Sequence, residues 1–154
     1  MTEPNWLDDG EFRAWIGYRR MRLLLDAQIA RDLSRDSDLS MADYDVLSAL
    51  TDEPDHRRRL NALADRMLWS KSRLSRHIGR MDQRGLVTRT DSPDDGRGAD
   101  VVLTALGLRT IEAAAPDHVA SVRRHFVDLL TPEELAALGD LAERVLDRLP
   151  EQTA

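Results

Sequence analysis

The sequence predicts a mainly α-helical fold that also contains one small β-hairpin. The helix formers Leu, Ala and Arg are abundant among the 154 residues, and apolar residues recur at helical spacing along most of the chain. The aromatic content of 5% argues against a β-sandwich or barrel. Two short β-rich segments, LVTRT and ADVVLT, flank the turn-forming stretch DSPDDGRG at residues 91–98, and this arrangement predicts the hairpin.

The first predicted helix, residues 11–34, carries two apolar stripes rather than one. A helix with two apolar faces must bury both, so we expect one face to pack on its own domain and the other on a partner subunit. The first stripe is Phe12, Ile16, Leu23, Ala27 and Ala30, and the second is Trp15, Tyr18, Leu25 and Ile29.

Three further helices are predicted before the hairpin. Ser40, with Asp43 three residues on, is typical of the start of a helix, and a polar loop, residues 52–59, follows that helix. Asn61 is expected to cap a short helix, and Ser70 a longer one over residues 71–84 that ends at Gly85. Two helices joined by a tight turn make a helix-turn-helix.

The C-terminal part is predicted to be helical. Thr104 is expected to cap a helix that runs to about residue 130 with a kink at Pro116, and Thr131 with Glu134 forms a capping box for the last helix. We therefore predict a single domain, 1–154. It contains a winged helix-turn-helix lobe at 41–103, and the helices 11–34 and 105–149 form a dimerisation lobe, because they carry more apolar surface than one small domain can bury.

Charge is distributed unevenly along the chain. The net charge is −6, yet residues 57–89 contain ten basic and two acidic side chains, a local charge of +8. A basic segment between acidic flanks is typical of a phosphate-binding surface. A solvated, charged helix face is the alternative interpretation.

The helix at residues 71–84 has the pattern of a DNA recognition helix. Leu74, Ile78 and Met81 are expected to face the core, which leaves a polar face opposite them. Arg73, Arg76 and Arg80 would share one exposed stripe, and arginine can bind guanine through two hydrogen bonds in the major groove. On a helix face that serves only solubility, acidic side chains would alternate with the basic ones. The candidate DNA contacts on this helix are Ser70, Lys71, Ser72, Arg73, Arg76, His77 and Arg80.

The hairpin tip presents one cation between two glycines. Arg97, flanked by Gly96 and Gly98, is expected to enter the minor groove beside the recognition helix, and Asp95 is expected to hold its guanidinium in place. A calcium loop is excluded, because the D-x-D-x-D-G pattern is not met and Val102 stands where such a loop has glutamate.

The sequence resembles the multiple-antibiotic-resistance-regulator (MarR) family of winged-helix repressors over nearly its whole length. The resemblance rests on S-x-S-x-L-S-R-x-I-x-R-M-x-x-R-G-L-V at residues 70–87 and on D-G-R-G-A-x-V-V-L-T at 95–104. It implies a homodimer formed by the outer helices, a pair of Asp95 and Arg97 in the wing, and contacts to double-stranded DNA from Ser70, Ser72, Arg73 and Arg76. Many members have a second arginine after the wing arginine, where this chain has Gly98.

The resemblance also implies an effector, because members commonly respond to small phenolic or anionic ligands bound between the dimer helices and the winged helix. Trp15, Arg19, Tyr44 and His118 are the candidate effector-binding residues. Each also has a structural interpretation, as a core residue or as the partner of a carboxylate. The chain contains no cysteine, so sensing by thiol oxidation is excluded.

The sequence offers no pattern for an enzyme, a metal site or a cofactor. Its four histidines form no close metal-ligating pair, and no phosphate loop or nucleophile motif is present. No apolar run reaches 18 residues and the N-terminus does not resemble a signal peptide, so we expect a cytoplasmic protein without a membrane span. We therefore predict a sequence-specific DNA-binding regulator, a ligand-responsive repressor that binds a pseudo-palindromic operator as a homodimer. The alternative function is a winged-helix protein-interaction module without DNA affinity, which would show apolar or aromatic anchors on the recognition helix.

Overall fold

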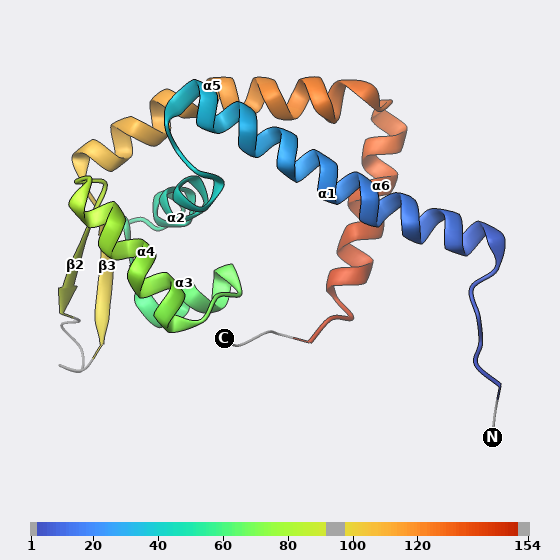
Figure 1. Cartoon of the computed structure of the whole chain (residues 1–154), viewed down its shortest axis with the longest axis horizontal. Coiled ribbons are helices and arrows are strands. Elements are labelled where there is room, and N and C mark those ends of the chain that lie inside the picture. The colour runs from blue at the N-terminus through green and yellow to red at the C-terminus, as the bar shows by residue number, and fades with distance from the viewer. Residues whose placement is uncertain (1–2, 92–97, 151–154) are drawn as a thin grey trace.

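A computed structural model describes residues 3–91 and 98–150 of the chain. The described residues confirm the mainly α-helical fold with a small sheet (Figure 1). The lobe at the lower left of Figure 1 holds the elements of the predicted winged helix. In chain order these are α2 (Met41–Thr51), β1 (Arg57–Arg59), α3 (Leu60–Met67), α4 (Lys71–Gln83), β2 (Val87–Asp91) and β3 (Ala99–Leu103).

The remaining helices form an arch above and beside that lobe (Figure 1). α1 and α5 pack against each other, and the N-terminal half of α1 projects away from the lobe. Within the described ranges, none of the helices combines the length and apolarity needed to cross a bilayer. The elements of the arch are α1 (Asp9–Ser37), α5 (Ala105–His125), the 3-10 turn η1 (Val127–Leu129) and α6 (Pro132–Leu146).

The predicted two-stranded hairpin is part of an antiparallel sheet with the strand order β1-β3-β2. Arg57 pairs with Val102 across β1 and β3, and Val87 pairs with Leu103 across β2 and β3. The prediction of a loop over residues 52–59 is therefore wrong for its last three residues, which form β1. Three consecutive arginines carry no alternation of polar and apolar side chains, so the strand pattern could not be seen.

The helix caps agree closely with the sequence. The side chains of Ser40, Ser70, Thr104 and Thr131 each accept a hydrogen bond from the backbone N–H three residues on, as predicted. Asn61 is an exception, because α3 begins at Leu60 and has no side-chain cap. The helix predicted at 11–34 extends over Asp9–Ser37, and the helix predicted to reach residue 130 ends at His125 and continues into η1.

The core lies between α2, α3, α4 and the sheet. The stripe of α4 that sequence spacing assigns to the core, Leu74, Ile78 and Met81, is fully buried. It packs in one cluster with residues of α2, of α3 and of the strands. Burial of such side chains contributes on the order of 2 kcal/mol each, so this stripe fixes which face of α4 remains outside.

A buried aspartate joins the two long helices of the arch. Asp32 of α1 is 2% exposed, and its carboxylate accepts a hydrogen bond of 2.7 Å from the Ser121 hydroxyl of α5. His125 Nε2 lies 2.9 Å from the same carboxylate, and Gln28, Arg35 and Arg124 also donate to it. The Ser121 bond, together with those from His125, Gln28 and Arg124, outweighs burial and holds the pKa of Asp32 well below its usual value.

We predict that Asp32→Asn lowers the thermal midpoint at neutral pH. The pKa of Asp32 is lower in the folded state than in the unfolded state. Its contribution to the free energy of unfolding is therefore complete above the unfolded-state pKa of about 4 and is lost as the pH falls further. The difference in thermal midpoint between the wild type and the variant should therefore narrow below about pH 4. Asp140→Asn, which changes an exposed carboxylate of α6, is the control. A difference that stays constant down to pH 2 would contradict this role of Asp32.

Candidate nucleic-acid interface

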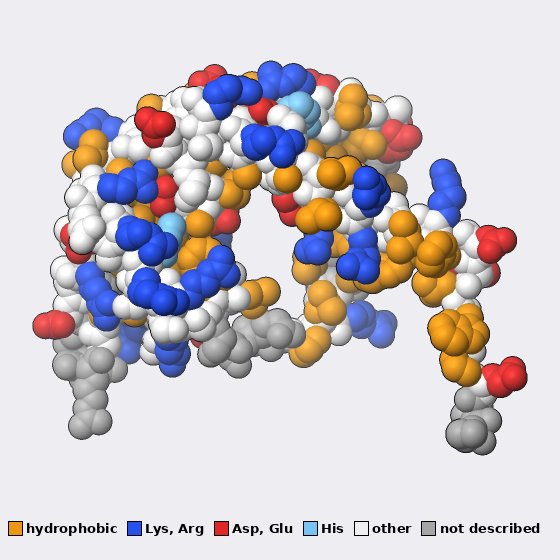
Figure 2. Space-filling model, in the orientation of Figure 1, with side chains coloured by type: hydrophobic (Ala, Val, Ile, Leu, Met, Phe, Trp, Pro, Cys, Tyr) orange, Lys and Arg blue, Asp and Glu red, His pale blue; other side chains and the backbone are white. Residues whose placement is uncertain are grey.

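The outer face of α4 carries the predicted arginine stripe. Arg73, Arg76 and Arg80 are all exposed, opposite the buried Leu74, Ile78 and Met81. Lys and Arg side chains gather over α3 and α4 in Figure 2. Every exposed residue of α4 is polar or glycine. The helix therefore presents a cationic surface that its own core packing holds in place.

The first turn of α4 is open to the outside. Ser70 caps the helix by accepting a 3.2 Å hydrogen bond from the backbone N–H of Arg73, and its hydroxyl lies 3.4 Å from that of Ser72. Ser70, Lys71 and Ser72 are all exposed. Short side chains beside a helix N-terminus leave room for a phosphate or a base edge to approach the backbone.

Trp69 lies directly before this turn and contacts the first arginine of the stripe. The guanidinium carbon of Arg73 lies 3.8 Å from the centroid of the Trp69 indole. The other ring contact of Trp69 is an edge-on one to His77, with centroids 5.5 Å apart. Trp69 was not among the residues predicted for the site. The spacing of four residues from Trp69 to Arg73 and from Arg73 to His77 is the signal that could have found it.

The expected position of His77 on the exposed face is wrong. His77 is only 8% exposed, because its ring turns inward toward α2, where Nε2 lies 3.0 Å from Oδ1 of Asp43. Arg80 donates to Nδ1 at 3.1 Å, and since a guanidinium has no acceptor, the ring proton belongs on Nε2, facing Asp43. Burial lowers the pKa of His77, which favours this neutral form.

Asp43 fastens α4 to α2. Its carboxylate is 3% exposed and receives a 2.8 Å hydrogen bond from Arg84, just after α4, in addition to the contact with His77. It also closes the capping box with Ser40. Burial by itself would raise the pKa of Asp43, but the hydrogen bonds from Arg84 and Ser40 outweigh it and lower the pKa. Asp43 therefore acts as a charged anchor for α4.

The sheet is tied to the same helix. Arg89 of β2 donates a 2.7 Å hydrogen bond to the Ser75 hydroxyl of α4. Arg57 of β1 pairs with Asp100 of β3 at 3.2 Å and donates to Thr90. These bonds fix the base of the hairpin beside α4. The predicted wing residues Asp95 and Arg97 lie outside the described residues.

Comparison with known proteins places this arrangement in a family. The MarR family model matches residues 37–98. The Escherichia coli transcriptional regulator HosA (O111:H- strain) is 31% identical over 130 residues, covering 84% of this chain and 94% of HosA. The chain belongs to the MarR family of winged-helix transcriptional regulators.

Two solved structures of MarR-family regulators from Streptomyces coelicolor share the whole fold of this MarR-family chain. AbsC is 41% identical and superposes with a TM-score of 0.89, covering 97% of this chain and 100% of AbsC. Sco3205, solved in complex with DNA, is 35% identical with a TM-score of 0.88, covering 96% of this chain and 92% of that chain. The likeness therefore extends through the winged-helix lobe and the arch.

The candidate effector residues fall into two separate pairs. The rings of Tyr44 of α2 and His118 of α5 contact each other, with their centroids 4.3 Å apart and their planes tilted by 42°. Burial lowers the pKa of His118, against an opposing effect of Asp45, and burial raises the pKa of Tyr44. Trp15 and Arg19 lie instead on the projecting half of α1, with the guanidinium 5.9 Å from the indole centroid. Within a single chain the four residues therefore form two pairs on different elements, and their role in an effector cleft stays a prediction.

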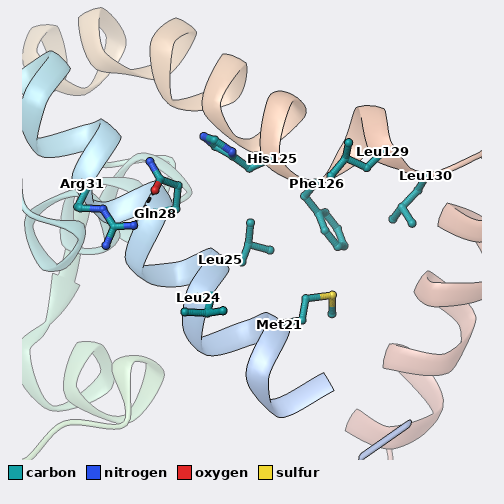
Figure 3. A pocket seen from close by; sticks show the side chains of 9 residues that line it. All are labelled: Met21, Leu24, Leu25, Gln28, Arg31, His125, Phe126, Leu129 and Leu130. Carbon is teal, nitrogen blue, oxygen red and sulfur yellow. Dashed lines mark hydrogen bonds between the residues drawn. The ribbon is translucent and has the colours of Figure 1, made fainter. Parts of the chain in front are cut away.

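Two cavities lie near these helices. One, of about 430 Å³, lies between α2 and α5 and is lined by Tyr44, Ser48, Thr51, His56, Leu108, Ile111, Glu112 and Ala115. The other, of about 490 Å³, lies between α1 and the end of α5. Figure 3 shows its mainly apolar walls, with polar groups at one end: it is lined by Met21, Leu24, Leu25, Gln28, Arg31, His125, Phe126, Leu129 and Leu130.

Proposed function

We propose that this MarR-family regulator binds double-stranded DNA as a homodimer and acts as a ligand-responsive repressor at a pseudo-palindromic operator. The observation that carries the proposal is the fixed cationic face of α4, with Arg73, Arg76 and Arg80 exposed above a fully buried stripe. Such a face suits the major groove, where arginine binds guanine O6 and N7. The 35% identity to a relative solved in complex with DNA supports the same conclusion.

The alternative, a protein-interaction module, fits this surface less well. Protein-binding surfaces are centred on aromatic or apolar anchors, to which arginine is often added, whereas lysine and acidic residues are depleted from them. The exposed residues of α4 include three arginines and a lysine but no apolar side chain. The surface is therefore better matched to an anionic polymer than to a protein.

We predict that substitution of Arg76 and substitution of Arg97 reduce the affinity for DNA in different ways. Fluorescence anisotropy over a range of salt concentrations measures both effects. Arg76→Ala should cost about 1–3 kcal/mol on a duplex selected by the wild-type protein and less on a random duplex, because it would read a base. Arg97→Ala should weaken binding and lower the salt dependence, because the wing would neutralise DNA charge. Arg109→Ala, an exposed arginine of α5, is the matched control. An equal loss of binding free energy on both duplexes would show that Arg76 contacts phosphate rather than a base.

The proposed dimer rests on the apolar surface of the arch. Both stripes of the N-terminal half of α1 remain exposed, including Phe12, Trp15 and Leu23. Met21 and Leu24 belong both to this surface and to the 490 Å³ cavity of Figure 3. A monomer rarely exposes so continuous an apolar patch, and a second copy of the chain is the occupant we propose for it.

We predict that Leu23→Glu dissociates the dimer. Leu23 is 67% exposed in the single chain, and a carboxylate buried at its position in an interface should raise the dimer dissociation constant by about tenfold or more. Leu68→Glu, at a residue 63% exposed between α3 and α4, is the matched control. Sedimentation equilibrium should give twice the chain mass for the wild type and the control. A wild type that sediments as a monomer would contradict the dimer.

The effector is proposed to bind in the cavity between α2 and α5, which Tyr44 lines. His118 is not among the lining residues, but its ring contacts that of Tyr44 at the edge of this cavity. The buried Nδ1 of His118 has no hydrogen-bond partner in the described part of the chain, and a phenol or a carboxylate would supply one. We predict that His118→Leu binds DNA like the wild type but needs severalfold more benzoate or phenol for release in the anisotropy assay. Release at the same concentrations would place the effector elsewhere.

A further inference from the structure

Trp69 occupies a distinctive place between the core and the proposed DNA-binding face. It precedes the N-cap of α4, its backbone N–H is held by Ala64 at 3.0 Å, and its side chain packs partly against the core cluster. The exposed Arg73 places its guanidinium over the indole ring, 3.8 Å from the centroid. Trp69 therefore touches both the packed interior and a residue of the arginine stripe.

The indole is also held from the side. His77 meets it edge-on at 85° between the ring planes, and His77 is itself fixed by Asp43 and Arg80. A ring with a buried neighbour and a fixed edge contact keeps its orientation when solvent or DNA approaches. The chain of contacts Asp43–His77–Trp69–Arg73 thus leads from α2 to the first arginine of the stripe.

We propose that Trp69 is a positioning residue for DNA recognition, whose indole holds the Arg73 guanidinium ready for a base edge. The inference rests on the proposed DNA-binding function. A guanidinium that lies over an aromatic face keeps the N–H donors at its edge available, and these donors are what binds guanine. A free arginine loses rotamer freedom on binding, whereas an arginine already held loses less.

Arg76 provides the internal comparison. It is exposed on the same helix, three residues from Arg73, and it has no cation–π partner among the described residues. Removal of Trp69 should therefore act through Arg73 and leave the contribution of Arg76 unchanged. A general loss of structure would affect both arginines.

A double-mutant cycle tests the proposal, with the wild type, Trp69→Leu, Arg73→Ala and the double variant. A duplex selected from a random library by the wild-type protein and a random duplex are titrated by fluorescence anisotropy, and the thermal midpoint is measured for each variant. Trp69→Leu should weaken binding to the selected duplex by about three- to tenfold. In the Arg73→Ala background, Trp69→Leu should hardly change the affinity for the selected duplex. In an Arg76→Ala background it should reduce that affinity by the same factor as in the wild type.

Two further variants distinguish positioning from folding. Trp69→Phe keeps an aromatic face and should restore most of the lost affinity. Arg73→Lys keeps the charge without the planar group and should lose selectivity for the selected duplex while binding random DNA nearly as well as the wild type. If Trp69→Leu does not fold, Trp69→Met, which fills more of the same volume, replaces it in the cycle.

The outcomes separate the two proposals. Three results would overturn the role of Trp69 while leaving selective DNA binding intact. Trp69→Leu could reduce the affinity equally with and without Arg73, it could leave the affinity unchanged, or Trp69→Phe could fail to restore it. A wild type that selects no duplex and binds all DNA equally would overturn the proposed function, and the role of Trp69 with it.

Discussion

The attachment of α4 to its own lobe is the constraint on which the rest of the molecule depends. The buried stripe Leu74, Ile78 and Met81 determines which face of the helix points outward, and the contacts of Asp43 with His77 and Arg84 determine how the helix sits against α2. The hydrogen bond from Arg84 to the Asp43 carboxylate is charge-assisted, and such bonds add geometric specificity to the apolar packing. The position of every side chain in the arginine stripe follows from this attachment.

A second buried aspartate performs the same task in the arch. Asp32 joins α1 to α5 through Ser121 and His125, as Asp43 joins α2 to α4. A buried carboxylate is costly unless it is fully paired, and removing its partners destabilises the structure strongly. Both carboxylates have a lowered pKa, which means that their charged forms are satisfied. Each lobe therefore contains one buried carboxylate that joins two of its helices.

Local sequence signals predicted most of the fold and part of the site. Capping residues and the apolar period of α4 depend only on neighbours in sequence, and apart from the Asn61 cap both were predicted correctly. β1 was missed because its pairing partner, β3, lies more than forty residues away and three arginines carry no strand pattern. His77 was assigned to the wrong face because its attraction to Asp43, on another helix, overrides its place near the border of the polar stripe. Likewise, spacing alone could not show that Tyr44 meets His118 while Trp15 does not.

The proposed function requires that α4 lies in a major groove with its arginine face toward the bases. Dimethyl sulfate footprinting on a duplex selected by the protein tests it most directly, because the reagent methylates guanine N7 in the major groove and adenine N3 in the minor groove. We expect two clusters of protected guanines about one helical turn apart, roughly 10 base pairs, one for each subunit. Arg76→Ala should remove protection at particular guanines in each cluster. Guanines that remain fully reactive throughout a duplex saturated with protein would contradict the account.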